Sequence, residues 1–292
     1  NMNATPDVSI VIPIYNEVET IPRLIQAVGD ALLPPDGSEA SDGVVGGPGT
    51  SFELILVDDG SKDGSRRLLA EWQAKTPWLK CLFLIRNYGQ STALQAGFDA
   101  AQGQFIVTLD GDLQNDPRDI PALIQILKDQ PDVDMVSGWR KDRQDATVSR
   151  KIPSQIANAL ISKVTKVRLH DYGCALKAYR ARVIHDLRLY GELHRFIPAL
   201  AAEVGAKIVE VPVRHHARSA GVSKYGIDRT IRVMLDLLWI RFTMRFLHRP
   251  IHAFGGIAMV MLFFGLGTLG WLAFDKLVLG EDIGGRPLLM LG

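Results

Sequence analysis

A pair of carboxylates one residue apart is the feature of this sequence best suited to chemistry. Asp110-Gly111-Asp112 directly follows the apolar run Phe105–Leu109. Alternate residues of an extended turn can aim both carboxylates at one point, and Gly111 leaves the backbone between them free of a side chain. Two hard oxygen ligands with open positions suit Mg²⁺ or Mn²⁺ bridging a diphosphate. Taken alone, an acidic triplet at a strand end is equally compatible with a solvated turn.

Two further polar clusters also follow apolar runs. Tyr15-Asn16-Glu17 comes after Val8–Pro13, and Asp58-Asp59-Gly60-Ser61 comes after Phe52–Val57. The second cluster could merely cap the next helix, with Ser61 and Asp63 as the capping residues. Three polar, acidic clusters at successive strand ends nevertheless favour a ligand site over three unrelated turns.

The expected helices and strands bring the three clusters to one edge. Nearly continuous apolar runs separated by helical patterns are typical of a mostly parallel sheet covered on both faces, which is an α/β fold. Ligands bind such sheets at the carboxyl ends of the strands. We expect strands at Val8–Pro13, Phe52–Val57, Cys81–Ile85 and Phe105–Leu109, and helices at Glu19–Leu33, Ser65–Ala74 and Ser91–Ala101.

Composition and missing motifs exclude several functional classes. No GxGxxG or GxxxxGK[ST] motif follows a strand, which argues against a classical dinucleotide fold and a P-loop NTPase. The 33 basic and 32 acidic residues give a net charge of +1, so there is no global case for nucleic-acid binding. Cys81 and Cys174 lie too far apart for a zinc knuckle and suit a reducing compartment. Pro34–Thr50 is rich in Pro, Gly and Ser and is expected to be a surface insertion.

The C-terminal part is expected to cross a membrane. The mean hydropathy of +0.08 is high for a soluble protein, and Ala253–Phe274 contains no charged residue. Its 22 residues would rise ~33 Å as a helix, enough for a hydrocarbon core of ~30 Å. A buried core helix is the alternative, but such helices rarely run this long without a polar face. The chain turns apolar again at 287–292, where we expect a second span to start.

Flanking charges predict the orientation of this membrane protein. Arg241, Arg245 and Arg249 precede the span, whereas the loop after it sums to −1. Positive flanks stay cytoplasmic, so a multi-pass protein of the inner (cytoplasmic) membrane with a cytosolic N-terminal region is expected. No signal-peptide pattern stands at the N-terminus. Asp228–His248 mixes arginines with apolar residues, as an amphipathic helix in the membrane interface or an ordinary bundle helix would.

Motifs along nearly the whole chain resemble one enzyme family. SIVIPIYNE, LVDDGSKDGS, RNYGQSTALQAGF, LDGDLQNDP, DYGCALKAYR and the run RHHARSAGVSKYG resemble family 2 glycosyltransferases of the GT-A fold. More narrowly, they resemble the polyisoprenyl-phosphate glycosyltransferases. This group includes dolichol-phosphate mannosyltransferases, bactoprenol glucosyltransferases and undecaprenyl-phosphate formamido-arabinose transferases. RNYGQ and DYGCALKAYR are more similar to the bacterial members with two membrane spans.

The resemblance implies domain limits. A cytosolic GT-A domain would occupy residues 1–226, with a nucleotide-sugar half at 1–115 and an acceptor half at 116–226. Juxtamembrane amphipathic helices would follow at 227–250, and a transmembrane helix at 251–274.

The resemblance also implies a donor site. Residues that match the family's motifs would hold the nucleotide base and ribose, close on the base, or bind the metal and the diphosphate. Gln114 resembles the family's third metal-side ligand, and Tyr15 could instead be simple core packing. The donor-site residues are Pro13, Tyr15, Glu17, Val57, Asp58, Asp59, Asp110, Gly111, Asp112 and Gln114.

The acceptor site is expected in the second half. The run with Arg140, Lys141, Arg143, Arg150 and Lys151 could be a solvated face, but an anionic lipid phosphate needs such cations. The matching family motifs add Arg195, which could alternatively cap a helix, and four residues of a mobile diphosphate-closing loop: Arg214, Arg218, Ser223 and Lys224.

The second half also contains a candidate catalytic carboxylate and a pair of neighbouring histidines. Asp171 is the best candidate for a catalytic carboxylate, but we expect it to orient the cations. His215 and His216 have no nearby histidine or cysteine that would complete a metal site.

The expected reaction is inverting transfer of a single sugar from a nucleotide-diphosphate sugar, such as UDP-glucose, to a polyprenyl phosphate, with Mg²⁺ or Mn²⁺ on the diphosphate. A transferase that acts on a sugar hydroxyl is disfavoured, since no QxxRW-like motif occurs. A non-enzymatic membrane-tethered nucleotide-binding scaffold is disfavoured by the intact DGD and SKY motifs. A homo-oligomer is compatible with the sequence.

Overall fold

The computed structural model describes residues 5–33, 51–141, 161–162, 165, 167–216, 235, 238–239, 242, 246 and 251–280. The chain divides into two compact units, Asn1–Thr230 and Ile231–Gly292. The insertion Pro34–Thr50 and the expected second span at 287–292 lie outside the described residues.

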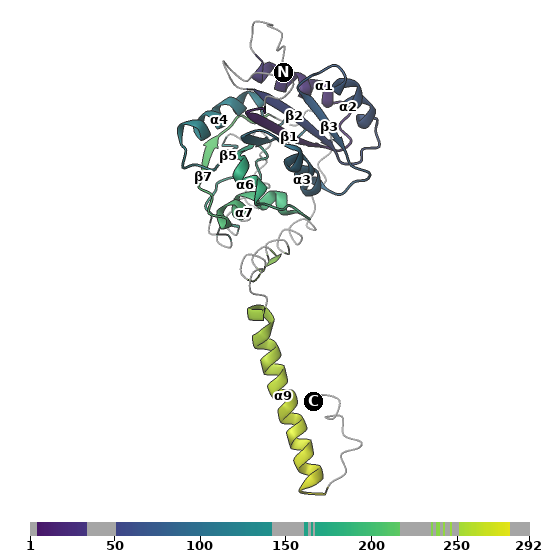
Figure 1. The fold of residues 1–292 in the computed structure, drawn as a ribbon, viewed down its shortest axis with the longest axis vertical. Coiled ribbons are helices and arrows are strands. Elements are labelled where there is room, and N and C mark those ends of the chain that lie inside the picture. The colour runs from purple at the N-terminus through teal and green to yellow at the C-terminus, as the bar shows by residue number, and fades with distance from the viewer. Residues whose placement is uncertain are drawn as a thin grey trace. The chain divides into compact units, whose positions relative to one another are not determined.

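Seven strands form one sheet in the described part of the first unit, in the order β3-β2-β1-β4-β6-β5-β7 (Figure 1). Hydrogen-bonded neighbours are parallel, except that β6 runs antiparallel to both β4 and β5. The mostly parallel sheet is therefore confirmed. The strands are β1 (Val8–Ile14), β2 (Phe52–Asp58), β3 (Leu79–Phe83), β4 (Phe105–Thr108), β5 (Met135–Trp139), β6 (Lys177–Arg180) and β7 (Ile208–Pro212).

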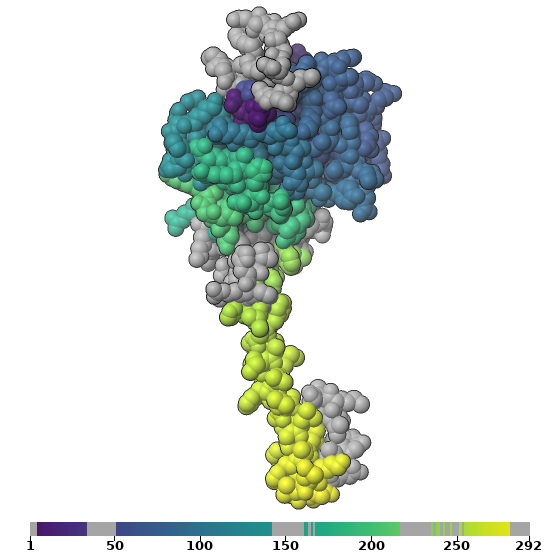
Figure 2. Space-filling view, in the orientation of Figure 1, coloured from purple at the N-terminus to yellow at the C-terminus, as the bar shows by residue number. Residues whose placement is uncertain are grey.

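Helices cover both faces of the sheet (Figure 1). The described helices of the first unit are α1 (Ile21–Leu32), α2 (Ser65–Gln73), α3 (Gln90–Ala100), α4 (Ile120–Asp129), α6 (Ala181–His185) and α7 (Ile197–Glu203), with short 3₁₀ helices η1 (Pro117–Asp119) and η2 (Leu193–Phe196). Two segments far apart in the chain, 51–141 and 167–216, form one continuous surface in the space-filling view (Figure 2).

Successive side chains of β1 point to opposite faces of the sheet and so belong to different layers of the core. Ile10, Ile12 and Ile14 belong to the cluster that also contains the buried faces of α1 and α4. Val11, which points to the opposite face, lies under α3, where a Cβ added to Gly97 would come within 2.2 Å of the Val11 Cγ1 atom. Glycine at position 97 therefore lets α3 pack directly on β1 and β2, which fixes the first turn of α3 near the carboxyl edge of the sheet.

β3 begins and ends two residues earlier than the pattern predicts. Leu79 pairs with Leu54 of β2 and is buried, so the strand starts there. Ile85 lies beyond the last pair, Asp58 with Phe83, and 90% of it is exposed. An apolar residue expected inside the sheet thus stands on a loop at its carboxyl edge.

The second unit contains α9 (Ile251–Leu277). Phe254–Leu277 is the one helix in the described ranges that is long and apolar enough to cross a membrane. Large side chains along it, such as Phe263 and Phe264, are exposed, an arrangement that suits hydrocarbon surroundings better than water. Upstream, Leu235, Leu238, Trp239, Phe242 and Phe246 are helical, with the i, i+3, i+4, i+7 spacing of one apolar face.

Candidate active site

The carboxyl ends of β1, β2 and β4 bring the three predicted clusters to one edge of the sheet. The three strands are parallel, with Ile14 opposite Asp58 and Val11 opposite Thr108. The chain therefore leaves each strand in the same direction and enters 15–17, 59–61 or 109–112 at this edge. We call it the donor edge.

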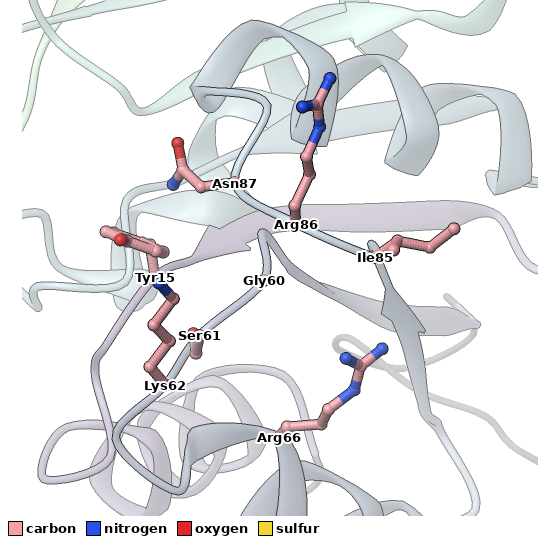
Figure 3. Close-up of a pocket in the computed structure, with 8 residues that line it drawn as sticks. All are labelled: Tyr15, Gly60, Ser61, Lys62, Arg66, Ile85, Arg86 and Asn87. Carbon is pink, nitrogen blue, oxygen red and sulfur yellow. The ribbon is translucent and has the colours of Figure 1, made fainter.

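A pocket opens at the donor edge between three loops. It is lined by Tyr15 after β1, by Gly60, Ser61 and Lys62 after β2, by Arg66 in the first turn of α2, and by Ile85, Arg86 and Asn87 after β3 (Figure 3). The sequence reasoning found only Tyr15 of these as a binding residue. Of the others, Gly60, Ser61 and Lys62 belong to LVDDGSKDGS, and Arg86 and Asn87 open RNYGQ, which follows β3 after Leu84 and Ile85.

Hydrogen bonds join the first two loops of this pocket. The backbone N–H of Asn16 donates to the Ser61 hydroxyl at 2.9 Å, and the Lys62 N–H donates to the Asn16 side-chain oxygen at 2.8 Å. Asn16 adopts φ 55°, a left-handed conformation that asparagine tolerates better than most residues. The Ser61 hydroxyl thus joins the two loops. Asp63 instead accepts from the Ser65 N–H at 3.0 Å, just before the start of α2, whose N-cap residue is Gly64.

Asp58 and Asp59 are both buried, and each has a different set of partners. Asp59 accepts hydrogen bonds from the N–H groups of Tyr88 and Gly89, at 2.7 and 2.9 Å, and so fixes the loop that carries Arg86 and Asn87. Asp58 accepts one bond from the Ser61 N–H through Oδ1. Its Oδ2 atom is buried without a hydrogen bond among the described residues, and the Arg66 Nε atom lies 4.0 Å away.

The remaining predicted base and ribose residues lie around the same edge. Pro13 pairs with Val57 across β1 and β2. Val57 is fully buried, beside Val11 beneath α3. Glu17 accepts a hydrogen bond from the Thr20 hydroxyl at 2.9 Å, at the start of α1. Tyr15 is 45% exposed, so it is available as a wall of the pocket and is not core packing.

The two carboxylates after β4 lie close together. Burial and the charge of Asp112 raise the pKa of Asp110 to about 6, against the opposing influence of Lys177 and Arg140. The Gln90 amide donates to Asp110 Oδ1 at 2.8 Å, and Asp112 Oδ1 accepts from the Gln114 N–H at 3.2 Å. A Cβ at Gly111 would come within 2.9 Å of the Ile14 side chain.

This donor set fits a divalent cation. Two partly buried carboxylates whose charges repel each other gain from a dication between them, and both are hard oxygen ligands. The described residues hold no cluster of three or more His, Cys, Asp or Glu side chains suited to a metal. Two carboxylates with the Gln114 amide would leave coordination positions for the oxygens of a diphosphate.

Arg140 and Asp171 form a nearly buried ion pair beside the donor edge. The Arg140 Nε and Nη2 atoms donate to the two Asp171 oxygens at 2.7 and 2.9 Å. The Asp171 side chain is 7% exposed, and the Glu210 carboxylate accepts from the Asp171 N–H at 2.9 Å. Burial lowers the pKa of Arg140, but its bonds to Asp171 outweigh this effect and raise the pKa above its usual value. Asp171 therefore holds the guanidinium in one orientation and keeps it charged.

A buried lysine not singled out in the sequence supports this pair. Lys177 is 4% exposed, and its ammonium group donates to the carbonyl oxygens of Tyr172 and Cys174. These two residues flank Gly173, whose N–H donates to Asp171 at 3.1 Å. Lys177 thus fastens the turn that carries Asp171.

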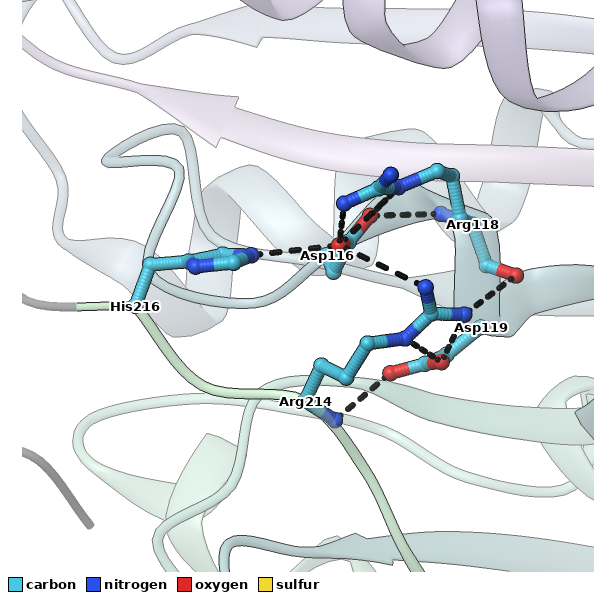
Figure 4. Close-up of polar contacts among 5 residues, drawn as sticks. All are labelled: Asp116, Arg118, Asp119, Arg214 and His216. Carbon is cyan, nitrogen blue, oxygen red and sulfur yellow. Dashed lines mark hydrogen bonds and ion pairs between the residues drawn. The ribbon is translucent and has the colours of Figure 1, made fainter. Parts of the chain in front are cut away.

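Arg214 lies in an ion-pair network around Asp116 and Asp119 (Figure 4). Its backbone N–H and its Nε atom both donate to Asp119, at 2.7 and 2.8 Å. Asp116 is 4% exposed and is bound by Arg118 and by the His216 ring at 3.1 Å. Burial raises the pKa of Asp116, but the bonds from Arg118 and His216 outweigh it and hold the pKa well below the usual range.

The Asp116 network ties the segment after β7 to the segment that carries Gln114. The His216 N–H donates to the Gln114 carbonyl at 2.8 Å, and Asn115 forms an isolated bridge with His215. The histidine pair therefore contributes to the packing of two chain segments. A direct role of Arg214 toward a phosphate remains a prediction, since its described bonds run to Asp119 and Arg118.

The other acceptor-side residues fall into two groups. Arg195 lies in η2 and pairs with Glu192 at 2.9 Å. Five predicted cations and a serine lie outside the described residues, so their roles stay predictions: Arg143, Arg150, Lys151, Arg218, Ser223 and Lys224.

Comparisons with known proteins place the chain in a family. Residues 9–188 match the family model described as Glycosyl transferase family 2, so the chain belongs to the family 2 glycosyltransferases. A dodecaprenyl-phosphate galacturonate synthase of Rhizobium johnstonii is 46% identical over 98% of this chain and 81% of its own length. An undecaprenyl-phosphate 4-deoxy-4-formamido-L-arabinose transferase of Klebsiella pneumoniae is 36% identical over 97% of this chain and 81% of its own length.

Solved structures share the fold at low sequence identity. A glucosyl-3-phosphoglycerate synthase of Mycobacterium tuberculosis, in complex with Mn²⁺, UDP and phosphoglyceric acid, superposes with a TM-score of 0.60 at 16% identity, covering 82% of this chain and 78% of its own. A mannosyltransferase of Pyrobaculum calidifontis, in complex with GDP-Man and Mn²⁺, gives a TM-score of 0.56 at 20% identity, over 83% of this chain and 65% of its own. The first unit has the GT-A fold, as the motifs predicted.

Proposed function

We propose that this glycosyltransferase moves a single sugar, with inversion, from a uridine diphosphate sugar to a polyprenyl phosphate at the cytoplasmic face of the inner membrane, using Mg²⁺ or Mn²⁺. One observation carries the proposal: three features lie together at or beside one edge of the sheet. They are the pocket, the two mutually repelling carboxylates Asp110 and Asp112, and the Arg140 guanidinium held by Asp171. The printed names of the relatives at 46% and 36% identity support the polyprenyl phosphate acceptor.

The donor edge offers what a nucleotide diphosphate needs. Tyr15 is an aromatic wall for a planar base, and Arg66, Arg86 and Asn87 carry N–H donors for the carbonyl oxygens of uracil. Asp110 and Asp112 would hold the metal with Gln114. When bound, the metal neutralises charge that develops on the departing diphosphate.

The acceptor side supports a phosphate nucleophile that needs no strong base. A phosphate monoester has a second pKa of about 6 and is mostly a dianion at pH 7. The site must then hold two anions close together, which calls for oriented cations. Arg140 is such a cation, and its bidentate bond to Asp171 uses the carboxylate as an orienting group. The predicted Arg150, Arg218 and Lys224 would add to it.

The second unit supports a membrane location. α9 is long enough to cross a bilayer and carries exposed apolar side chains along its length. An enzyme anchored in this way meets a polyprenyl phosphate within the same membrane, which raises the effective concentration of the acceptor.

The identity of the transferred sugar is the most specific part of the proposal. UDP-glucose was the sequence-based expectation, whereas the relatives are named for galacturonate and for formamido-arabinose. We therefore place UDP-galacturonate first, because the relative with 46% identity carries that sugar in its name.

The test is a transfer assay with the full chain in detergent. UDP-galacturonate and UDP-glucose are each supplied with undecaprenyl phosphate and Mn²⁺, and the lipid product is identified by mass. We expect one sugar per lipid, no product in EDTA, and faster turnover with UDP-galacturonate. Transfer to a free sugar hydroxyl without any lipid-linked product would overturn the proposed acceptor.

A further inference from the structure

The pocket at the donor edge is lined by three side chains that only donate hydrogen bonds. Lys62, Arg66 and Arg86 carry N–H groups and no acceptor. No carboxylate stands among the described residues that line the pocket (Figure 3). A ligand in this pocket therefore binds best when it turns acceptor atoms toward these side chains.

Arg66 is held in place by two neighbouring side chains. Its guanidinium lies over the Phe83 ring, with the Cζ atom 5.1 Å from the ring centroid. Its Nε atom lies 4.0 Å from the Oδ2 atom of Asp58. The Asp58 side chain is fully buried, whereas that of Arg66 is 48% exposed. A buried charge and an aromatic face thus anchor a guanidinium that still reaches the pocket.

The buried Asp58 carboxylate depends on the positive charge of Arg66. Its Oδ1 atom accepts from the Ser61 N–H at 3.1 Å, but its Oδ2 atom has no hydrogen bond among the described residues. Burying a charge is costly unless an opposite charge compensates it, so the attraction to Asp58 keeps the guanidinium at this position. The described residues give the Arg66 side chain no hydrogen bond, so its N–H groups remain for a ligand.

Arg66 lies at the end of the donor edge that is remote from the metal carboxylates. The strands follow the order β3-β2-β1-β4, with Asp110 and Asp112 after β4 and Phe83, beneath Arg66, at the end of β3. Neighbouring strands lie about 4.8 Å apart, which places β3 ~14 Å from β4. A nucleotide whose diphosphate lies at Asp110 and Asp112 extends along this edge and turns the far side of its base toward Arg66. In a pyrimidine that far side is position 4, opposite the nitrogen that carries the ribose.

We propose that Arg66 is a specificity-determining residue that donates to the 4-carbonyl of uracil and so selects uridine over cytidine nucleotides. The inference rests on the proposed function, which supplies the uridine diphosphate donor. Uracil and cytosine have the same shape, but position 4 carries an acceptor oxygen in uracil and a donor amino group in cytosine. Opposite a guanidinium, the amino group finds no acceptor and the Arg66 N–H loses its own, which disfavours cytosine.

The test compares UDP with CDP, which differ only in the base. Titration calorimetry on the full chain in detergent, with Mn²⁺, gives the Kd of each. We expect the wild type to bind UDP about tenfold more tightly than CDP or better. Arg66→Met keeps an unbranched side chain over Phe83 but has no N–H donor, so the Kd for UDP should rise about tenfold while the Kd for CDP stays the same.

Arg67→Met is the matched control for this substitution. Arg67 is the next residue of α2, its side chain is 87% exposed and pairs with Glu71, and it does not line the pocket. Both Kd values should match those of the wild type.

Arg66→Lys is the variant to use if Arg66→Met does not fold, as its melting temperature will show. Lysine keeps a positive charge for Asp58, but a single ammonium group lacks the fork of donors that can serve Asp58 and a base together. The preference for UDP over CDP should therefore fall by about threefold.

Three results would overturn the role of Arg66: a wild type that binds UDP and CDP equally, an undiminished preference for UDP in both Arg66 variants, or equal weakening of UDP and CDP in Arg66→Met. The last result would assign Arg66 to the phosphates. These measurements need neither a lipid nor a transfer reaction. A wild type that binds neither nucleotide with Mn²⁺ overturns the proposed donor, and the role of Arg66 with it, whereas a UDP preference that persists in the variants overturns the role of Arg66 alone.

Discussion

The donor edge and the acceptor side are built in different ways. At the donor edge, each polar cluster follows its own strand directly, and parallel pairing of β1, β2 and β4 aligns the clusters. On the acceptor side, the key contacts join residues far apart: Arg140 and Asp171 are 31 positions apart, and Asp171 and Glu210 are 39 apart. The donor edge is thus set by sheet topology and the acceptor side by buried ion pairs, so substitutions should affect the two in different ways.

The largest effect is expected at the donor edge. Asp112→Asn replaces a carboxylate ligand by a much poorer amide ligand, and transfer should fall by about a thousandfold or more. The thermal melting temperature should stay close to that of the wild type. Asp129→Asn, an exposed change at the end of α4, serves as the control in the same radiolabel assay. Near wild-type turnover of Asp112→Asn in EDTA would rule out the metal role.

The next effect is expected on the acceptor side, and it should combine activity with stability. Arg140→Met removes the guanidinium that pairs with the buried Asp171 carboxylate, a change that costs about 3–5 kcal/mol in comparable cases. Turnover should fall about a hundredfold. Melting curves of the variant and the wild type, recorded with the transfer assay, measure both losses. A stable variant with unchanged turnover would contradict the account of Arg140.

Asp171→Asn tests whether the Asp171 carboxylate orients cations or acts as a base. If Asp171 orients cations, the variant should lose less turnover than Lys224→Ala or Arg218→Ala, and the acid limb of its pH–rate profile should match the wild type, because the lipid phosphate is the titrating group. A profile whose acid limb disappears in Asp171→Asn, together with mild effects of the two cation changes, would identify a conventional base.

A smaller effect is expected in the pocket. Tyr15→Ala removes the exposed aromatic wall, and the Kd for UDP should rise about tenfold, as for the loss of one stacking contact and its buried area. Titration calorimetry with UDP and Mn²⁺ measures the change. Tyr190→Ala, another half-exposed tyrosine that does not line the pocket, is the control and should bind UDP like the wild type.

The smallest effect on activity is expected from Asp116→Asn, which acts through stability. Because the folded-state pKa of Asp116 is lowered, its contribution is fully present above the unfolded pKa of about 3.9 and is lost as the pH falls below it. The variant should be less stable by about 2 kcal/mol at pH 7, and the difference should shrink toward pH 3. Melting temperatures at the two pH values test the sign, and a difference that grows toward pH 3 would contradict it.

The donor edge could be predicted from the sequence because each of its polar clusters directly follows, along the chain, the strand that positions it. The position of each cluster after an apolar run is enough to place Asp110 and Asp112 at the same edge of the sheet as Asp58 once the strands are parallel. The pocket was found only in part. Ile85 was assigned to β3, although that strand ends at Phe83, so the loop that lines the pocket was not recognised.

The acceptor side could be predicted only as a set of residue types. Asp171 was expected to orient cations, and this role stays a prediction. The structure pairs Asp171 with Arg140, and no periodicity in the sequence reveals which arginine it binds. Lys177 lies on β6, the strand whose antiparallel direction no local pattern indicates. Ser91 was taken only as the start of a helix, because the residue it binds, His194, lies 103 positions away.

The separation of the two sides is tested most directly by UDP binding in the presence of Mn²⁺, measured by calorimetry on the full chain and its variants. The account predicts that Asp112→Asn abolishes metal-dependent UDP binding, whereas Arg140→Met, at a temperature where it remains folded, binds UDP with the wild-type Kd. Metal-dependent UDP binding that survives in Asp112→Asn, or is lost in folded Arg140→Met, would contradict it.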